Sequence, residues 1–202
     1  MSATCVSASP DLDTRGGGWR PAIVGAALAV TLCGLAYPTL GSVLGAALFP
    51  AQAAGSLVWR EGAAVGSALV AQPFADARYL QPRPSAVGFD PRAAAGSNQA
   101  PSHPALRQRM QAEAQAVAAR EGIALAEVPV ELISASGSGL DPHLSPAAAE
   151  LQVPRIARAR GLDPAAVRAL IAAHTDGPWL GVFGEPRVNV LAVNLALDDA
   201  TP

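Results

Sequence analysis

The chain has 202 residues, of which half are apolar and 15% are charged, and its formal net charge is −2 at pH 7. This length suits one globular domain plus an extra segment, and the apolar share is typical of a chain that contacts a membrane. All 14 basic residues are arginine. The lack of lysine excludes a Walker-type ATP site and a lysine Schiff base, because both need that side chain.

The N-terminal segment is rich in Ser, Thr and Gly and shows no apolar periodicity. Such a composition cannot bury enough apolar surface to fold. We therefore expect a disordered tail over residues 1–20.

An uncharged stretch follows, from Pro21 to Trp59. Within it, Ala22–Leu48 supplies 27 consecutive residues, whereas a helix needs only about 20 to cross the ~30 Å core of a bilayer. The sequence therefore predicts one transmembrane helix over residues 21–49. Pro38 is tolerable there, because neighbouring helices can satisfy the carbonyl that it frees, or it marks a kink after Tyr37.

Two other interpretations of this stretch are possible. Ala51-Gln52-Ala53 resembles a small-residue cleavage site, so the segment could be a signal peptide, but the apolar run is longer than the ~7–15 residues of a signal sequence. A buried core helix is disfavoured because such helices are shorter. An uncleaved anchor is the favoured interpretation.

Small residues in the span have the spacing of helix-packing motifs. Gly41 and Gly45 form a GxxxG pair, and Gly25 and Ala29 repeat the spacing; both pairs would let another helix approach closely. In a chain this rich in alanine and glycine the spacing also arises by chance, so both interpretations stay open.

Basic residues flanking the span predict its orientation. Arg15 and Arg20 precede it, while Arg60 is the only basic residue within fifteen positions after Leu48. The short flank with more arginine usually stays in the cytoplasm, and a long domain after an N-terminal anchor can be translocated regardless of its charge. We expect a cytoplasmic N-terminus and a periplasmic domain over residues 55–202.

That domain is expected to be a compact extracytoplasmic α+β domain. It contains no cysteine, so its own core must hold it. Apolar runs and turn residues predict strands over residues 55–59, 65–72, 128–135 and 188–197, and the prolines predict an ordered loop over 73–101. A helix is expected over 104–121, capped by Ser102. Two helical segments are expected from Ser145 to Gly161, separated at Pro154, followed by a helix capped by Asp163.

The run "SGSGLDPH", Ser136–His143, gathers residue types that can carry chemistry. Ser136 or Ser138 could be a nucleophile with His143 and Asp141, but groups this close on one loop rarely converge as a triad. Gly137 and Gly139 could present backbone N–H groups to an anion, although a lone glycine-rich loop is weak evidence. A structural turn, with Asp141 before Pro142, is the favoured interpretation.

Metal and nucleic-acid sites are disfavoured as well. His103, His143 and His174 lie far apart in the chain, with no second ligand at metal spacing. Residues 60–202 carry twelve arginines against fourteen acidic residues, without a basic stripe. No enzymatic activity emerges from the residues alone.

Several longer runs resemble the C subunit of the Kdp-type potassium-transporting ATPase, a bacterial pump that joins a channel-like potassium-translocating subunit to a P-type ATPase subunit. They are "YPTLGSVLGAALFPAQAAGSL" (37–57), "GSALVAQPF" (66–74), "YLQPRPSA" (79–86), "GSN" (96–98) with Pro101, "SGSGLDPHLSPAAAELQVPRIARARGL" (136–162) and "GEPRVNVLAVNLALD" (184–198).

The resemblance implies a non-catalytic accessory subunit in the cell inner membrane, with one N-terminal helix and a periplasmic domain. It implies both large pump subunits as partners, and a role in assembly and as a catalytic chaperone that raises the pump's ATP affinity. A nucleotide contact is implied near Gln152, although cytoplasmic ATP cannot reach a domain beyond the membrane. Structural or partner contacts are implied for Ser136, Gly137, Ser138, Gly139, Asp141, Arg187 and Asn189.

A second hypothesis of another class remains. The chain could be a freestanding membrane-anchored envelope domain that binds a small ligand or another protein. Identification of the partners would separate the two hypotheses.

Overall fold

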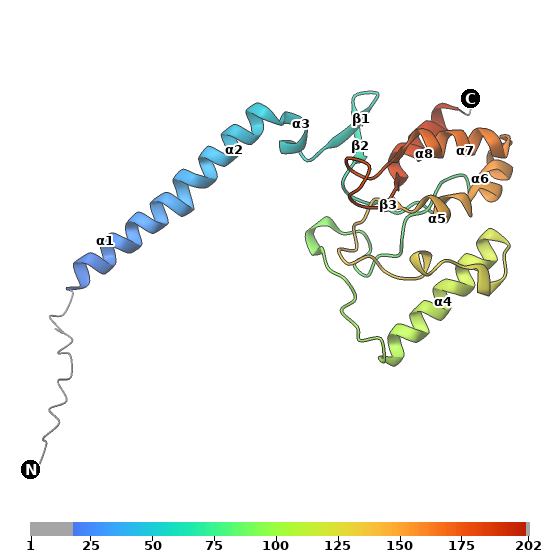
Figure 1. The fold of residues 1–202 in the computed structure, drawn as a ribbon, viewed down its shortest axis with the longest axis horizontal. Coiled ribbons are helices and arrows are strands. Elements are labelled where there is room, and N and C mark those ends of the chain that lie inside the picture. The colour runs from blue at the N-terminus through green and yellow to red at the C-terminus, as the bar shows by residue number, and fades with distance from the viewer. Residues whose placement is uncertain (1–17, 201–202) are drawn as a thin grey trace, which may run out of the picture. The chain divides into compact units, whose positions relative to one another are not determined.

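The computed structural model describes residues 18–200, which divide into a unit ending at Ala54 and a unit starting at Gly55. Each unit is described by itself, and Figure 1 labels their elements. Residues 1–17 of the expected tail lie outside the described residues.

The first unit is a helical stretch over Trp19–Leu48, long and apolar enough to cross a membrane and with none of its residues buried. This confirms the expected apolar N-terminal helix. Its segments, with the short helix that follows, are α1 (Trp19–Ala29), η1 (Val30–Ala36), α2 (Tyr37–Leu48) and α3 (Pro50–Ala53).

Segment η1 is π-helical and comes directly before the turn that contains Pro38. The backbone N–H of Tyr37 donates to the carbonyl of Leu32, five residues earlier. A proline lacks the donor for the carbonyl four residues before it and clashes with that carbonyl. The wider π turn accommodates Pro38, so the helix continues through it instead of ending.

The second unit starts with a β-hairpin, β1 (Leu57–Arg60) and β2 (Ala63–Ser67), paired antiparallel. Glu61 and Gly62 connect them with φ of 51° and 81°, the left-handed conformation that a tight hairpin turn requires. The two expected strands are present with shorter bounds. The Arg60 guanidinium pairs with the carboxylates of Asp198, at 3.8 Å, and Asp199, and so links β1 to the end of the chain.

The proline-rich segment that follows has a single short turn of regular structure, η2 (Pro91–Ala93), before helix α4 (Pro104–Glu121). The ring Nδ1 of His103 accepts the N–H of Ala105 at 3.2 Å and caps α4. The cap is therefore one residue later than the predicted Ser102. Gly122 ends the helix with φ of 73°.

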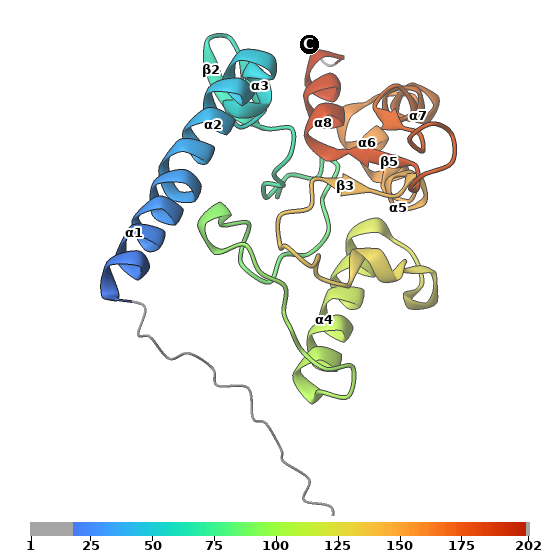
Figure 2. The same ribbon diagram turned by 60° about the vertical axis from the view of Figure 1, so that its left-hand side comes forward.

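Four helices and a small sheet enclose the core. The sheet has the strand order β3-β5-β4, all antiparallel. Its strands and the helices are β3 (His143–Leu144), β4 (Thr175–Asp176), β5 (Arg187–Asn189), α5 (Pro146–Glu150), α6 (Val153–Arg160), α7 (Pro164–Ala173) and α8 (Val190–Asp199). In Figure 2 these helices gather around the sheet, and α4 lies toward the other end of the domain.

The core consists of apolar side chains from all these layers, including Ile156 of α6, Val167 of α7 and Leu197 of α8, each fully buried. Leu80, from the irregular proline-rich segment, is fully buried among them. The mixed α+β class is therefore confirmed.

Two predicted strands are wrong. Residues 128–135 hold the 3₁₀ turn η4 (Val130–Leu132), preceded by η3 (Leu125–Glu127), because Pro129 cannot donate to a strand ladder. Residues 190–199 form helix α8. Asn189 ends β5 and its Oδ1 accepts the N–H of Ala192 at 3.0 Å, which is the bond of a helix N-cap.

Candidate functional site

The residues Ala77–Gln81 begin in a turn and continue as irregular backbone. We call them the clamped segment, because side chains from two distant helices hold their backbone. Asn194 of α8 accepts the N–H of Leu80 at 2.7 Å and donates to its carbonyl at 2.9 Å. Gln152, at the start of α6, accepts the N–H of Gln81 at 2.9 Å and donates to its carbonyl at 3.1 Å. Two amide side chains thus replace the ladder that a neighbouring β-strand would supply.

Arg155 fastens the same segment from α6. Its Nη1 donates to the carbonyls of Ala77 and Tyr79, and its Nη2 donates to Gln152 Oε1 at 2.8 Å. Its Nε donates to the carboxylate of Glu121 at 2.9 and 3.1 Å. Both side chains are buried. A buried charge is costly unless it is paired and hydrogen-bonded, so the pair ties α4 to α6.

Arg160, at the end of α6, makes a second set of bonds. Its guanidinium donates to the carbonyls of Arg78, at 2.7 Å, and Leu197, at 2.8 Å, and to Asp198 Oδ1 at 2.8 Å. It also lies over the Tyr79 ring, 5.0 Å from the centroid, where a cation is attracted to the π face. The clamped segment, α6 and α8 are therefore joined by charge-assisted hydrogen bonds.

The turn that begins the clamped segment is fixed by Asp76. Its carboxylate accepts the backbone N–H of Arg78 at 2.9 Å. This bond is the main reason that the pKa of Asp76 is lowered, and the charge of Arg78 adds to it. Because hydrogen bonds to the charged form favour it, Asp76 holds this turn down to a lower pH than a free aspartate would.

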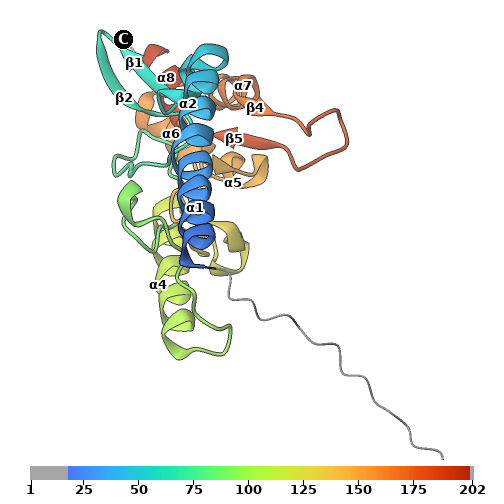
Figure 3. The same ribbon diagram turned by 90° about the vertical axis from the view of Figure 1, so that its left-hand side faces the viewer.

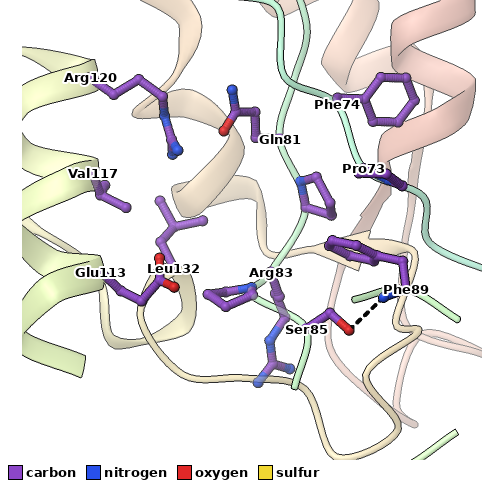
Figure 4. Close-up of a pocket in the computed structure, with 12 residues that line it drawn as sticks. Pro73, Phe74, Gln81, Arg83, Ser85, Phe89, Glu113, Val117, Arg120 and Leu132 are labelled. Carbon is purple, nitrogen blue, oxygen red and sulfur yellow. Dashed lines mark hydrogen bonds between the residues drawn. The ribbon is translucent and has the colours of Figure 1, made fainter. Parts of the chain in front are cut away.

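A pocket of about 270 Å³ opens beside the clamped segment. Glu113, Val117 and Arg120 of α4 form one wall, and the 81–85 run faces them (Figure 4). Ser85 Oγ accepts the N–H of Phe89 at 2.9 Å and holds the loop at the rim. The pocket is slightly smaller than the ~300–1,000 Å³ typical of small-molecule sites.

The run "SGSGLDPH" is built into the fold as a turn, as the favoured interpretation expects. Ser136 is buried and its N–H donates to the carbonyl of Pro84 at 3.1 Å. Ser138 Oγ accepts the N–H of Leu140 at 3.1 Å. Gly139 has φ of 70°, and its carbonyl accepts the Ser85 hydroxyl at 2.7 Å. The run therefore packs against the loop that carries the pocket.

A close approach also surrounds the glycines of this run. A Cβ placed on Gly96 would lie only 2.8 Å from the carbonyl oxygen of Gly137. A Cβ on Gly139 would meet Val87 Cγ2 at 2.6 Å and the carbonyl oxygen of Ala95 at 2.9 Å. The two glycine-containing runs can therefore pack this closely only because Gly96 and Gly139 have no side chain.

Asp141 and His143 line a recess together with Glu131, Glu185 and Arg187. Asp141 accepts the N–H of His143 at 3.0 Å and lies 3.3 Å from the Arg83 guanidinium. Its carboxylate is 3.6 Å from His143 Nδ1. Within residues 18–200 no hydrogen bond joins His143 to Ser136 or Ser138, and no group of three or more His, Cys, Asp or Glu side chains could hold a metal.

The two remaining residues that were predicted as contacts, Asn189 and Arg187, bind other residues of the same domain. Asn189 donates from Nδ2 to the carbonyl of Ala68 at 2.9 Å, besides capping α8. Arg187 of β5 is half exposed and lies 3.4 Å from Asp176 of β4. Whether either residue meets a partner stays a prediction.

In the N-terminal helix the predicted packing residues leave open surface. A Cβ placed on Gly25, Gly41 or Gly45 would meet nothing within 4 Å, and Ala29 is exposed. Whether another helix packs at these positions stays a prediction.

Sequence reasoning missed Asn194, Arg155 and Arg160. Both arginines lie in the "VPRIARARGL" run, where they recur five residues apart, and nothing in that spacing says that they are buried. Asn194 sits at a core-facing position of α8, a signal hidden by the prediction of a strand there.

These features define the structural class of the protein. It is an α+β domain whose buried polar groups hold its own backbone, preceded by one helix long enough to cross a membrane. Residues 19–199 match the family model described as "K+-transporting ATPase, c chain". The chain belongs to this family.

Relatives support the assignment. The chain is 58% identical over 167 residues to a protein of Xanthomonas oryzae pv. oryzae, covering 83% of this chain and 80% of that protein. It is 53% identical over 184 residues to one of Sorangium cellulosum, covering 90% and 97%. It is also 53% identical over 167 residues to one of Shewanella putrefaciens, covering 83% and 84%. Each is named a potassium-transporting ATPase KdpC subunit.

Replacing Gln152 by alanine tests the clamp. We expect Gln152→Ala to lower the free energy of unfolding by about 2–4 kcal/mol, because buried donors and acceptors of Gln81 and Arg155 lose their partner. Urea unfolding of the full chain in detergent measures this. Gln81→Ala is the matched control, since it keeps the clamped backbone groups; equal unfolding midpoints for both variants would refute the clamp.

A second substitution tests the glycine turn. Gly139→Ala should cost about 2–5 kcal/mol of stability, because its backbone is left-handed and the new Cβ meets neighbours. Gly137→Ala, two residues away, meets nothing within 4 Å and should change stability little. Thermal unfolding followed by circular dichroism compares the two, and similar losses would contradict the structure.

Proposed function

We propose that this chain is the non-catalytic accessory subunit of an ATP-driven potassium pump, acting in assembly and stabilisation of the complex. The family match over residues 19–199 carries the proposal. The site supports it, because the buried polar side chains bind the chain's own backbone. A chain of this kind acts through its surfaces.

The proposed arrangement places the chain in the cell inner membrane. Residues 1–20 form a cytoplasmic tail, 21–49 the membrane helix and 55–202 a periplasmic domain. Arg15 and Arg20 before the helix, against Arg60 after it, support this direction. The division of the structure after Ala54 is consistent with these boundaries.

The proposed partners are a channel-like potassium-translocating subunit and a P-type ATPase subunit. The open surface at Gly41 and Gly45 supports packing of the helix against the first of these, because small residues let helix backbones approach. The periplasmic domain then rests over the external mouth of that subunit, where it restricts motion or ion approach.

A catalytic-chaperone role, raising the ATP affinity of the pump, is part of the proposal. A direct nucleotide contact at Gln152 is the weaker part. This side chain is fully buried, and its amide has partners at both the oxygen and the nitrogen. A nucleotide could reach it only by displacing the clamped segment. Weaker ATP binding in Gln152→Ala without loss of stability would favour direct contact.

The alternative is a freestanding anchored domain that binds a small ligand or another protein. The pocket in Figure 4 would suit it, with Arg120, Glu113 and the apolar Phe89 and Val117 in its lining; a second pocket of about 500 Å³ lies between Ala68, His174 and Asn189. The small volume of the first pocket disfavours all but small ligands there. Purification of the native chain without pump subunits would favour this alternative.

Changing the open helix face tests the proposed assembly. The double variant Gly41→Leu, Gly45→Leu should lower recovery of the pump subunits in a detergent pull-down about tenfold or more, because the added side chains keep the helices apart. Quantitative mass spectrometry of the purified complex measures the ratio. Ala47→Leu, on the other side of α2, is the control and should assemble normally; undiminished assembly of the double variant would count against packing at this face.

Protease treatment tests the direction of insertion. In intact spheroplasts, external protease should degrade residues 55–202 while the short N-terminal tail stays protected, because only the domain is exported. Immunoblotting with tags at the two ends reads the result. Survival of the C-terminal tag, or a mature chain without its first fifty residues, would overturn the proposed topology.

A further inference from the structure

Four large apolar side chains are exposed at the end of a hairpin that has no role in the proposed function. The run "WLGVF", residues 179–183, connects β4 to β5, and we call it the apolar tip. The exposed fractions are 68% for Trp179, 72% for Leu180, 77% for Val182 and 61% for Phe183. Figure 3 shows the hairpin between β4 and β5 projecting from the body of the domain.

The apolar tip is held in a defined conformation. The N–H of Trp179 donates to the carbonyl of Phe183 at 2.7 Å, and the reverse bond measures 2.9 Å. The two rings lie 5.9 Å apart between centroids. Leu180 adopts φ of 53° at the turn, a left-handed conformation that is unfavourable for a non-glycine residue. The fold therefore presents these side chains without burying them.

The exposed area is informative about the partner. Side chains of these sizes, about two-thirds exposed, leave roughly 500 Å² of apolar surface in one patch. A stable protein interface needs about 800 Å² on each side. The apolar tip alone is therefore small for a protein interface, whereas a loop that enters a lipid surface needs only a few apolar side chains.

The charges near the apolar tip fit a lipid surface. Asp176, Glu185 and Arg187 stand at the base of the hairpin, and the eight residues from Gly177 to Gly184 carry no charge. Four residues on each side of a hairpin span about 13 Å. Interfacial segments enter about 5–10 Å below the headgroups, so the apolar tip reaches this depth while the charged base stays in water.

A short connection joins the second unit to the apolar helix that would hold it at a bilayer. The apolar helix ends at Leu48, and the second unit begins at Gly55. A domain tethered this closely meets the membrane at a local concentration in the millimolar range. A contact too weak to recruit a free protein is sufficient in a chain that is already anchored.

We propose that the apolar tip inserts reversibly into the interface of the bilayer that holds the N-terminal helix, as a second membrane contact. Trp179 suits this region, because tryptophan rings gather at the headgroup level. Phe183 adds apolar surface of the kind that interfacial segments bury at the edge of the acyl chains. The contact fixes the tilt of the domain over the membrane. It depends on the membrane anchor and not on the proposed pump subunits.

A spin label on the tip tests this in the full-length chain. Val182→Cys, in a Cys5→Ser, Cys33→Ser background, carries a nitroxide in nanodiscs of phosphatidylcholine and phosphatidylglycerol without pump subunits. The same label at Val130, which is 66% exposed in η4, is the matched control. We expect the ratio of oxygen to nickel-chelate accessibility to be roughly threefold or more higher at 182, as for a site below the headgroups.

A further variant separates lipid insertion from other causes of protection. Adding Trp179→Ser and Phe183→Ser should return the label at 182 to the accessibility of the label at 130, with the unfolding midpoint unchanged, since neither residue belongs to the core. Equal water exposure at 182 and 130 in the parent would overturn the proposal. Protection that arises only when pump subunits are added would also overturn it, and would assign the tip to a protein partner.

Discussion

The domain depends on the fastening of one irregular segment by side chains that come from far along the chain. Residues 77–81 enter the core through Leu80 without a neighbouring strand, yet their polar backbone groups are satisfied by Gln152, Asn194, Arg155 and Arg160. An unpaired buried backbone group costs about as much as a lost hydrogen bond. The small sheets of two and three strands could not supply these bonds, so buried amides and arginines do.

This use of polar side chains bears on what the protein does. The residue types that suggest chemistry in the sequence are occupied: Ser138 holds a turn, Asp141 binds Arg83 and the His143 backbone, and Gln152 binds the clamped segment. The described surface instead carries exposed apolar and glycine positions. The chain belongs to a family of pump subunits, and the exposed glycines of the helix and the apolar tip are where we propose that it contacts a partner helix and lipid.

Much of the fold could be predicted from local signals. Proline at the start and glycine after the end mark α4 and α6, and Asp163 caps α7 as expected. The C-terminal run was misassigned because its alternation suggested a strand, although the buried residues Val190, Val193 and Leu197 recur at helical spacing. Sequence alone could not show the clamp, since Gln152 and Asn194 bind residues 71 and 114 positions away.

The pairing of Arg60 with Asp198 and Asp199 joins the first strand after the anchor to the final helix. The same helix supplies Asn194 to the clamped segment. Residues near the start of the domain therefore form these bonds only once α8 is present, and contacts of such long sequence separation slow folding. A chain truncated before α8 would therefore lose both the partners of Arg60 and the amide that holds Leu80.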